Sequence, residues 1–497
     1  MCSKKLAVYV PSNIPLWTQI QKGHLTLQSQ VSDSPYASFP PTPDDRYLEY
    51  EIWVCNQESK SLPEFHLACA KHLLGKPNGY PDPILIEKPI WTTWAKYGKG
   101  INQDQVLDFS NKIISHGFEI SQLELDDMWT TKYGDYEIDC HKFPDFSNMI
   151  EQLRNKGIPL TAWVHPFINL ESKNASNKNL HKYFVQTASG EPGIINWWNG
   201  QGYIIDITNP DAVHWLREQL DGIKKHGVYS FKFDAGEVHY LPKNFRLHSG
   251  TEPNDFSRAY ARFAASFGGA VEARVGSKTQ ELPILIRTID RASKWVEIGL
   301  QTLIPSSLNL SLHGYFWNLP DIIGGNGYGQ FEAGEINTLP EDKELYIRWV
   351  QANTFLLTMQ FSFCPWEFDD DTVKICQDLL KLRSKWVNYI KNECEKAVHS
   401  GIPVIRYSII HKYSISFRPL WWHLETLEAY KCFDQFFVGD KLLIAPVVYQ
   451  GVKTRDVFLP EGRWRDHKGT IVIGPHKITV ETPLEVLPFY EKLSKED

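Results

Sequence analysis

The chain has 497 residues, of which 42% are hydrophobic and 22% are charged, and its formal net charge is −7 at pH 7. A chain of this length predicts several domains of roughly 100–200 residues, one of which is larger if it is a barrel. No long basic run is present, so no nucleic-acid partner is implied, and no apolar run approaches the ~20 residues of a membrane span. The eight cysteines are scattered without a CxxC pair, which argues against a zinc ribbon or a dense disulfide framework.

Residues 1–86 predict a small β-rich domain. They are rich in proline and contain short alternating apolar runs at 6–10, 24–28 and 47–55. A Gly/Pro-rich stretch at 75–83 predicts the linker that follows. The first residues lack the apolar core and the small-residue cleavage site of a signal peptide. We therefore expect a short N-terminal domain that carries no leader, with truncation of its start as one reading.

Residues 87–397 alternate short apolar runs with amphipathic stretches. Strands that alternate with helices form a parallel sheet, and eight such units predict a (β/α)8 barrel, also called a TIM barrel. After residue 398 the helical pattern stops, and short strands with turn signals predict a C-terminal β-sandwich over 398–497. The fold class is α/β. The predicted barrel strands lie at residues 89–97, 120–127, 159–167, 203–207, 229–234, 283–290, 314–321 and 359–366.

Charged side chains stand at the carboxyl ends of these strands. Asp126 and Asp127 end the second predicted strand, Asp234 ends the fifth, and Asp321 ends the seventh. Barrel enzymes carry their functional side chains at this end of the strands. Helix N-capping explains an isolated aspartate in such a place. It explains neither the adjacent pair Asp126 and Asp127 nor Lys232 two residues before Asp234.

A ring of carboxylates with a few cations and many Trp residues suits glycoside hydrolysis, which needs two carboxyl groups on either side of the scissile bond. One of them must be ionised, and Lys232 beside Asp234 favours the anion. The other must hold a proton. Asp290 follows the apolar run 284–286 and precedes Trp295. We expect an apolar, partly closed environment to keep Asp290 protonated.

The other acids leave room for different chemistry. Asp126 and Asp127 are expected to accept hydrogen bonds from sugar hydroxyl groups. Oxygen ligands also suit Mg²⁺, but metal sites in barrels usually combine His with acids, and only His165 comes near such a pattern. The second alternative is a catalytically inactive carbohydrate-binding or interaction protein that retains the pocket.

Several stretches carry a family resemblance, among them the octet SFKFDAGE at 230–237. They resemble glycoside hydrolase family 31, and within it the branch of the myogenesis-regulating glycosidases and the SITS-binding proteins. The resemblance covers roughly residues 87–490. The other stretches are PIWTTWAKY (89–97), QLELDDMW (122–129), LTAWVHPFIN (160–169), IRTIDR (286–291) and FVGDKLLIAPVV (437–448).

The resemblance implies a retaining enzyme that acts on α-linked sugars, of α-galactosidase type, without a cofactor or a metal. It assigns the nucleophile to Asp234 and the general acid/base to Asp290. In a retaining enzyme we expect these two carboxyl groups to lie roughly 5–7 Å apart in one pocket. The resemblance places a sugar subsite at Asp126, Asp127, Trp163, Trp198, Lys232, Arg274 and Asp321.

The chain also departs from the pattern of its branch. Residues 407–417 look like an insertion, which we expect to affect stability more than chemistry. Ala292 stands where relatives tend to carry a second acid, and this weakens the inference about the substrate. The branch carries an N-terminal membrane anchor and implies the secretory pathway, whereas this sequence shows neither anchor nor signal. A carbohydrate is the expected partner, and a homodimer is one option for assembly.

Overall fold

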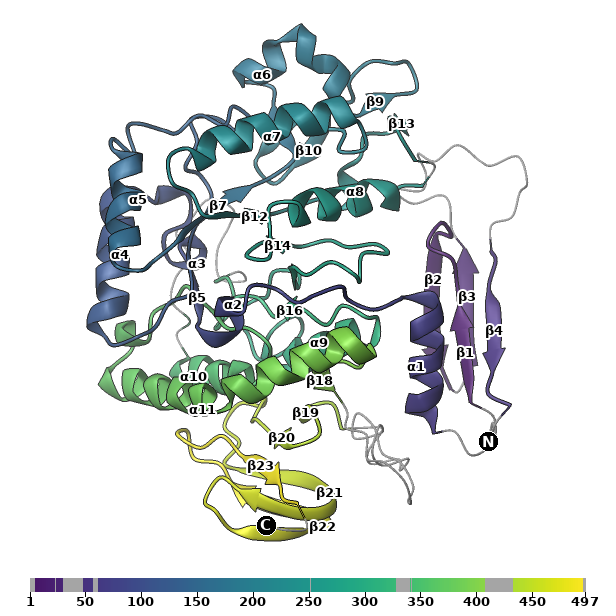
Figure 1. The fold of residues 1–497 in the computed structure, drawn as a ribbon, viewed down its shortest axis with the longest axis vertical. Helices are drawn as coiled ribbons and strands as arrows, with labels where there is room; N and C mark the ends of the chain where they lie inside the picture. The colour runs from purple at the N-terminus through teal and green to yellow at the C-terminus, as the bar shows by residue number, and fades with distance from the viewer. Residues whose placement is uncertain are drawn as a thin grey trace.

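The structure is a computed structural model, and it describes residues 5–22, 24–29, 48–56, 61–250, 252–327, 340, 342–406 and 432–494. A barrel with its surrounding helices occupies the centre of the molecule (Figure 1). The N-terminal strands lie to one side of it, and a C-terminal sheet lies against another side. Within the described ranges, no helix combines the length and the apolarity needed to cross a membrane.

Eight short strands form the barrel, and every pairing between neighbours is parallel. Their order in the sheet is β16-β15-β14-β12-β7-β6-β5-β17. A parallel bridge between Ile322, just after β16, and Gln360 in β17 closes the ring. The predicted TIM barrel is therefore confirmed. The strands are β5 (Ile90–Thr92), β6 (Leu123–Leu125), β7 (Leu160–Val164), β12 (Ser230–Phe233), β14 (Glu272–Ala273), β15 (Leu285–Arg287), β16 (Asn318–Leu319) and β17 (Gln360–Phe361).

One of the eight predicted strands was wrong. Residues 203–207 overlap β11 (Gly200–Ile204), which belongs to a separate antiparallel sheet with β8 (Phe167–Asn169) and β10 (Ile195–Trp197). The barrel strand that the prediction missed is β14, which lies between the predicted strands at 229–234 and 283–290. A strand of two residues shows no alternation of its own, so periodicity cannot reveal it. As a result β12, which carries Lys232, is the fourth barrel strand and not the fifth.

Helices cover the outside of the barrel (Figure 1). Polar side chains fix where several of them begin, because an N-cap oxygen accepts a hydrogen bond from a free backbone N–H group. Asn102, Asp145, Asn209, Asp342 and Asp369 act in this way. The helices are α4 (Gln103–Ser115), α5 (Phe146–Asn155), α7 (Pro210–Lys224), α8 (Asn254–Ala265), α9 (Leu303–Leu312), α10 (Lys343–Asn353) and α11 (Asp370–Ser400).

The C-terminal strands form an antiparallel sheet in the order β18-β19-β20-β23-β21-β22, which confirms the predicted C-terminal β region. Its core includes Phe437, Trp464 and Tyr490. Arg348 of α10 donates to the carbonyl of Thr482 at 2.6 Å and so ties this sheet to the barrel. The predicted insertion at 407–417 lies outside the described residues. The strands are β18 (Ile405–Arg406), β19 (Phe436–Val438), β20 (Leu442–Ile444), β21 (Thr454–Asp466), β22 (Ile471–Glu481) and β23 (Phe489–Lys492).

The N-terminal region contains two antiparallel pairs of strands, β1 with β4 and β2 with β3. Helix α1 (Leu62–Leu73) follows, and a capping box between Ser61 and Glu64 begins it. The N-terminal strands are β1 (Leu6–Tyr9), β2 (Leu16–Gln21), β3 (His24–Ser29) and β4 (Glu51–Val54). Shorter elements are α2 (Ile84–Glu87), α3 (Trp94–Tyr97), α6 (Lys173–Ser176), β9 (Gln186–Thr187) and β13 (Phe245–Arg246).

Candidate active site

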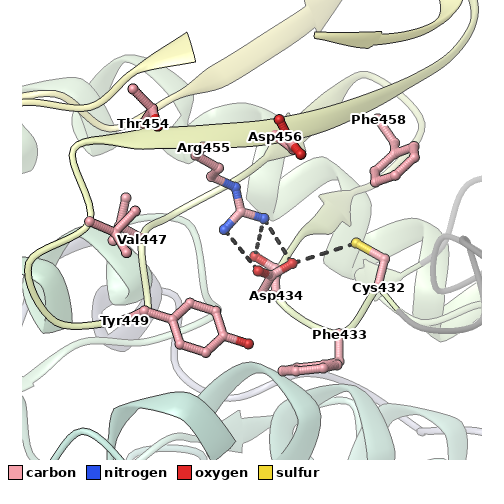
Figure 2. Close-up of a pocket in the computed structure, with 10 residues that line it drawn as sticks. Cys432, Phe433, Asp434, Val447, Tyr449, Thr454, Arg455, Asp456 and Phe458 are labelled. Carbon is pink, nitrogen blue, oxygen red and sulfur yellow. Dashed lines mark hydrogen bonds and ion pairs between the residues drawn. The ribbon is translucent and has the colours of Figure 1, made fainter. Parts of the chain in front are cut away.

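Two cavities lie away from the carboxyl ends of the barrel strands. One, of about 420 Å³, opens on the C-terminal sheet (Figure 2). There Arg455 binds Asp434 through Nη2 at 2.9 Å, and its Nη1 donates to the carbonyl of Pro446, so both ends of the guanidinium group are used within the protein. The other, of about 700 Å³, is lined by residues at the amino ends of β7 and β12, where Tyr229 donates to Asp82 at 2.9 Å. Neither brings the predicted catalytic acids together.

The predicted site residues gather at the other face of the barrel. Because the strands are parallel, their carboxyl ends meet on one face, and eight of the nine residues lie in or just after barrel strands. Trp198 is the exception, since it lies between β10 and β11. The eight are Asp126 and Asp127 after β6, Trp163 in β7, Lys232 in β12, Asp234 after β12, Arg274 after β14, Asp290 after β15 and Asp321 after β16.

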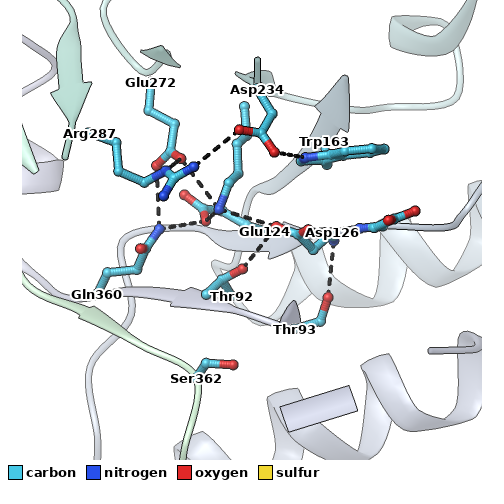
Figure 3. A network of polar contacts seen from close by, with 12 residues as sticks. Thr92, Thr93, Glu124, Asp126, Trp163, Asp234, Glu272, Arg287, Gln360 and Ser362 are labelled. Carbon is cyan, nitrogen blue, oxygen red and sulfur yellow. Dashed lines mark hydrogen bonds and ion pairs between the residues drawn. The ribbon is translucent and has the colours of Figure 1, made fainter. Parts of the chain in front are cut away.

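Asp234 is held as a buried anion. Trp163 donates its indole N–H to Oδ2 at 2.8 Å, and Arg287 and Arg274 bind Oδ1 at 3.1 and 3.2 Å. Figure 3 shows Arg287 and Trp163 on opposite sides of this carboxylate. Burial alone would raise the pKa of Asp234, but Arg274, Arg287 and Lys232 outweigh it and lower the pKa below its usual value. Asp234 is therefore ionised at neutral pH, as a nucleophile must be.

Asp290 shares its cations with Asp234. Nη1 of Arg274 lies 3.2 Å from Oδ1 of Asp234 and 3.5 Å from Oδ1 of Asp290, so the two oxygens are at most about 6.7 Å apart. Arg287 also binds both carboxylates, with its Nη1 at 2.7 Å from Asp290. The structure thus brings the two predicted catalytic acids into one site, at a separation that does not exceed the predicted upper limit of about 7 Å.

The predicted apolar environment of Asp290 was wrong. Its side chain is 30% exposed, and two guanidinium groups lie against it. The apolar residues Leu285 and Ile286 belong to strand β15, and the chain that leaves β15 brings Asp290 back toward Arg287 in the same strand. Sequence proximity to an apolar run did not indicate apolar surroundings, because a side chain at a strand end faces the residues of neighbouring strands.

Lys232 lies below Asp234 and binds three carboxylates. Its Nζ is 3.1 Å from Asp126, 3.4 Å from Glu272 and 3.5 Å from Glu124. All four side chains are buried. Burial opposes the charge of Lys232, yet the carboxylates raise its pKa well above the usual value. Asp126 also accepts a hydrogen bond from Thr92 at 3.4 Å (Figure 3), so it is fixed before any ligand arrives.

Asp127 faces a different set of groups from its neighbour Asp126. Its Oδ1 accepts from the hydroxyl of Tyr133 at 2.8 Å, and its Oδ2 accepts from the side-chain amide of Asn199 at 2.9 Å. Burial raises the pKa of Asp127 to about 6, against the two hydrogen bonds that lower it. The two adjacent acids were predicted to act alike, but only Asp126 contacts Lys232.

This raised pKa predicts a pH dependence of stability. Because the folded protein holds the Asp127 proton more tightly than the unfolded chain, Asp127 costs stability as pH rises from about 4 to about 6. Asp127→Asn should remove this cost, which amounts to up to about 3 kcal/mol. Urea unfolding at about pH 4.5 and pH 7.5 measures it. Relative to the wild type, the free energy of unfolding of the variant should be higher at the higher pH than at the lower one. An equal difference at both pH values would contradict the raised pKa of Asp127.

Arg274 links the catalytic acids to the mouth of the site. Besides Asp234 and Asp290, it binds Glu237 through Nε at 2.6 Å, and its guanidinium carbon lies 5.2 Å from the centre of the Trp198 ring. Trp198 is 42% exposed. Glu237 therefore orients a cation at the site entrance, and the exposed ring offers the kind of flat surface on which sugars stack.

Asp321 was predicted to contact the sugar, but other groups of the protein enclose its carboxylate. Its Oδ1 accepts from Arg287 at 3.1 Å, and its Oδ2 accepts from the backbone of Arg291 and the side chain of Asn326 at 2.8 and 2.6 Å. Its backbone adopts a left-handed conformation, with φ at 74°. Both oxygens are thus used within the protein, so its contacts orient Arg287 and the loop after β16.

Sequence reasoning missed four side chains of this site. Arg287 was placed on its strand but not in the site, and Glu124, Glu272 and Gln360 were not considered. Gln360 donates to Glu124 at 2.7 Å and to Glu272 at 3.3 Å. Glu124 stands two residues before Asp126, on the same face of its strand, which is the one signal that could have found it. Glu272 could not be found without recognising β14.

The described residues contain no group of three or more His, Cys, Asp or Glu side chains arranged to hold a metal ion. His165, the residue closest to a metal-site pattern, is buried among the rings of Tyr133, Trp163 and Trp197. Burial lowers the pKa of His165 to about 3, so its ring is neutral. Its Nδ1 accepts a hydrogen bond from the backbone of Phe167 at 3.2 Å. His165 packs the base of the site.

Comparison with known proteins identifies the family of this chain. The model of the family 31 TIM-barrel domain of glycosyl hydrolases matches residues 89–266, and that of the family's C-terminal domain matches residues 414–493. Myogenesis-regulating glycosidase from Mus musculus is 34% identical over 98% of this chain and 67% of its own length. SITS-binding protein from Tetronarce californica is 25% identical over 99% of this chain and 68% of its own length.

Solved structures share the fold. A cycloalternan-degrading enzyme from Trueperella pyogenes in complex with cycloalternan superposes with a TM-score of 0.79 at 19% identity, over 99% of this chain and 69% of its own. A family 31 sulfoquinovosidase from E. rectale superposes with a TM-score of 0.76 at 20% identity, over 99% and 72%. The chain belongs to glycosyl hydrolase family 31.

Proposed function

We propose that this protein is a retaining α-glycosidase, with Asp234 as the nucleophile and Asp290 as the general acid/base. The observation that carries the proposal is that both carboxylates contact the same nitrogen of Arg274 and so lie at most about 6.7 Å apart. Inverting enzymes need room for a water molecule between their two carboxyl groups, which typically separates them by about 6.5–9.5 Å. A separation at or below the lower end of that range suits direct attack on the sugar.

The reaction then has two steps. In the first, a lone pair of the Asp234 carboxylate forms a bond to the anomeric carbon while the glycosidic bond breaks and its oxygen takes the proton of Asp290. In the second, Asp290 takes a proton from water, the water oxygen bonds to the anomeric carbon, and the ester bond to Asp234 breaks. The proton returns to Asp290, and the sugar keeps its anomeric configuration.

The surroundings of Asp234 and Asp290 differ in the way that their roles as nucleophile and general acid/base require. Asp234 is buried and held by two guanidinium groups and an indole N–H, which fix its anion. Asp290 is more exposed, so it can move with a ligand. For Asp290 to act first as an acid, a bound substrate must loosen its ion pair with Arg287, which retains Asp234 and Asp321 as partners.

The identity of the sugar is a separate part of the proposal. The sequence resemblance implies an α-galactoside. Relatives of this chain include proteins named alpha-xylosidase, from Emericella nidulans, and alpha-glucosidase 2, from Bacillus thermoamyloliquefaciens, which are 25% and 22% identical to it. Aryl α-galactosides, α-glucosides, α-xylosides and α-sulfoquinovosides therefore form the panel, and we expect release of the aryl group from the α-galactoside to be the fastest.

Product stereochemistry tests the mechanism directly. NMR of the sugar released in the first minutes should show the α anomer, because two inversions at the anomeric carbon give net retention. A β anomer as the first product would overturn the assignment of Asp234 as nucleophile. Hydrolysis of another sugar of the panel with retention would correct the substrate and leave the mechanism standing.

A catalytically inactive carbohydrate-binding protein is the second candidate function. The observation that favours it is the close contact between Asp290 and Arg287, at 2.7 Å, because an ion pair opposes the protonation that a general acid needs. Under this reading a sugar would bind without turnover. Calorimetric binding of galactose by a protein that hydrolyses no member of the panel would support it.

A further inference from the structure

We propose that Glu124 and Glu272 form a carboxyl pair beneath the active site that shares a single proton, with Glu124 as the neutral donor and Glu272 as the anion. Glu272 then acts as a positioning residue, because it orients the two cations that hold Asp126 and Asp234. The positioning role rests on the proposed glycosidase function. The protonation of the pair does not, and it can be tested separately.

The two glutamates face each other across the inside of the barrel. Glu124 lies on β6 and Glu272 on β14, both are buried, and Nζ of Lys232 contacts both, at 3.5 Å from Glu124 and 3.4 Å from Glu272. The amide of Gln360 on β17 donates to both, at 2.7 Å to Glu124 and 3.3 Å to Glu272 (Figure 3). Two buried carboxylates that share one lysine and one amide donor repel each other when both are ionised. A proton on one of them relieves this repulsion and allows it to donate a hydrogen bond to the other.

The charges around the pair lead to the same conclusion. Lys232 on β12 faces three carboxyl groups, those of Glu124, Glu272 and Asp126. Among the residues that the structure describes, the other buried cation in contact with this group is Arg287 on β15, which binds Glu272 but is also shared with Asp234, Asp290 and Asp321. Three buried anions beside one lysine would leave negative charge uncompensated, which is costly where water is excluded. A proton on one carboxyl group removes this excess.

Contacts identify which carboxyl group holds the proton. Glu272 touches both cations, Lys232 and Arg287, each at 3.4 Å from its Oε1. Of the cations in the described part of the chain, Glu124 contacts Lys232 alone, at 3.5 Å, and it also accepts from the amides of Gln122 and Gln360. Burial, followed by the charge of Glu272, raises the pKa of Glu124 well above its usual value. Glu124 is thus the neutral member.

The anion has a mechanical consequence for the catalytic acids. Glu272 holds Nε of Arg287, whose Nη2 binds Asp234 at 3.1 Å. Glu272 also holds Nζ of Lys232, which binds Asp126 at 3.1 Å. One carboxylate below the site therefore fixes both cations above it. Small errors in the placement of a reacting group are costly to rate, so loss of this anchor should lower kcat more than it raises KM.

Paired amide substitutions distinguish the two glutamates, because Gln keeps the shape and removes the charge. Glu124→Gln replaces a neutral group by a neutral group, whereas Glu272→Gln removes an anion, so Glu272→Gln should lower kcat by roughly 10²-fold, a larger loss than that of Glu124→Gln, with a smaller change in KM. A larger loss of kcat in Glu124→Gln than in Glu272→Gln would overturn the assignment.

A spectroscopic measurement decides the protonation without using activity. A protonated carboxyl group has a C=O stretching band that an ionised one lacks. At about pH 8, where the Asp127 carboxyl group is ionised, the infrared difference between wild type and Glu124→Gln should contain this band. Glu393→Gln is the matched control, since Glu393 is also buried but is paired with Lys396 at 2.7 Å, and its difference spectrum should lack the band. Absence of the band from the Glu124→Gln difference would refute the shared proton.

The outcomes keep the two proposals apart. A protein that hydrolyses no glycoside, yet shows the Glu124 band, retains the proton-sharing pair and loses the proposed activity. An active protein without the band keeps its function and loses the pair. Thermal unfolding adds a check that the variants fold. Glu124→Gln should unfold at or above the wild-type temperature at about pH 8, because the folded wild type must keep a proton on Glu124 that the unfolded chain releases, and glutamine removes this cost. A clearly lower temperature than that of Glu272→Gln would count against the assignment.

Discussion

Asp234→Asn is expected to lower turnover of the best aryl α-glycoside by roughly 10⁴-fold or more while the fold is retained. The amide cannot form the glycosyl ester, so the covalent route is lost. The side chain keeps its size, and the neighbouring cations retain Asp290, Asp321, Glu237 and Glu272 as partners. The measurement is initial rates under saturating substrate, together with circular dichroism of the variant.

Asp206→Asn is the matched control for this experiment. Asp206 is buried to a similar degree, but it lies outside the barrel strands and accepts hydrogen bonds from Thr208 and from the backbone of His248. This substitution should affect stability and leave kcat unchanged. A second variant sharpens the result: with Asp234→Ala, azide should restore reaction and give the glycosyl azide of inverted configuration. An Asp234→Asn protein with near wild-type activity would remove Asp234 from its role.

Arg287→Met is expected to destabilise the protein by roughly 3–5 kcal/mol, the cost of removing one partner from a buried ion pair. Arg287 binds Asp234, Asp290, Asp321 and Glu272 at 2.7–3.4 Å, and no other described cation contacts all four. Without it these acids repel one another at neutral pH. Their protonation relieves the repulsion, so the loss of stability should shrink as pH falls. Urea unfolding across a pH series measures both features.

Arg383→Met supplies a comparison in which charge repulsion plays no part. Arg383 is also buried, but it donates to the backbone carbonyl groups of Ile86, Thr354, Leu356 and Leu357. Its loss leaves buried acceptors without donors, which costs stability at every pH. We therefore expect both variants to be destabilised and only Arg287→Met to recover in acid. Parallel pH profiles for the two variants would contradict the role given to Arg287.

The sequence allowed much of the fold to be predicted because strand and helix periods differ. Seven of the predicted barrel strands contain a barrel strand of the structure, and the acids at their ends converge as parallel strands require. The wrong barrel strand at 203–207 and the missed barrel strand at 272–273 have one cause, the shortness of β14. With two residues in this strand, only its neighbours β12 and β15 identify it, and such pairing is not visible in a single sequence.

The environment of the acids was harder to predict than their positions. Asp234 was expected to be ionised beside Lys232. The structure also favours its ionised form, but through different partners, since Arg274 and Arg287 make the direct contacts. Asp290 was expected in apolar surroundings and has two cations instead. Burial and charge depend on residues from other strands, so adjacency along the chain carries little information about them.

The closure of the barrel has a consequence for how the protein assembles during synthesis. β17 pairs with β5, near the start of the barrel, and β17 also supplies Gln360 to the charged layer under the site. Contacts between such distant parts of a chain form slowly, because the entropy of closing a long loop must be lost first. A nascent chain that has emerged only through β16 therefore carries most of the acids and cations of the site, but it lacks β17, the strand that completes the barrel around them. Such a chain would be a natural client of chaperones, and the onset of glycoside turnover would report completion of the ring.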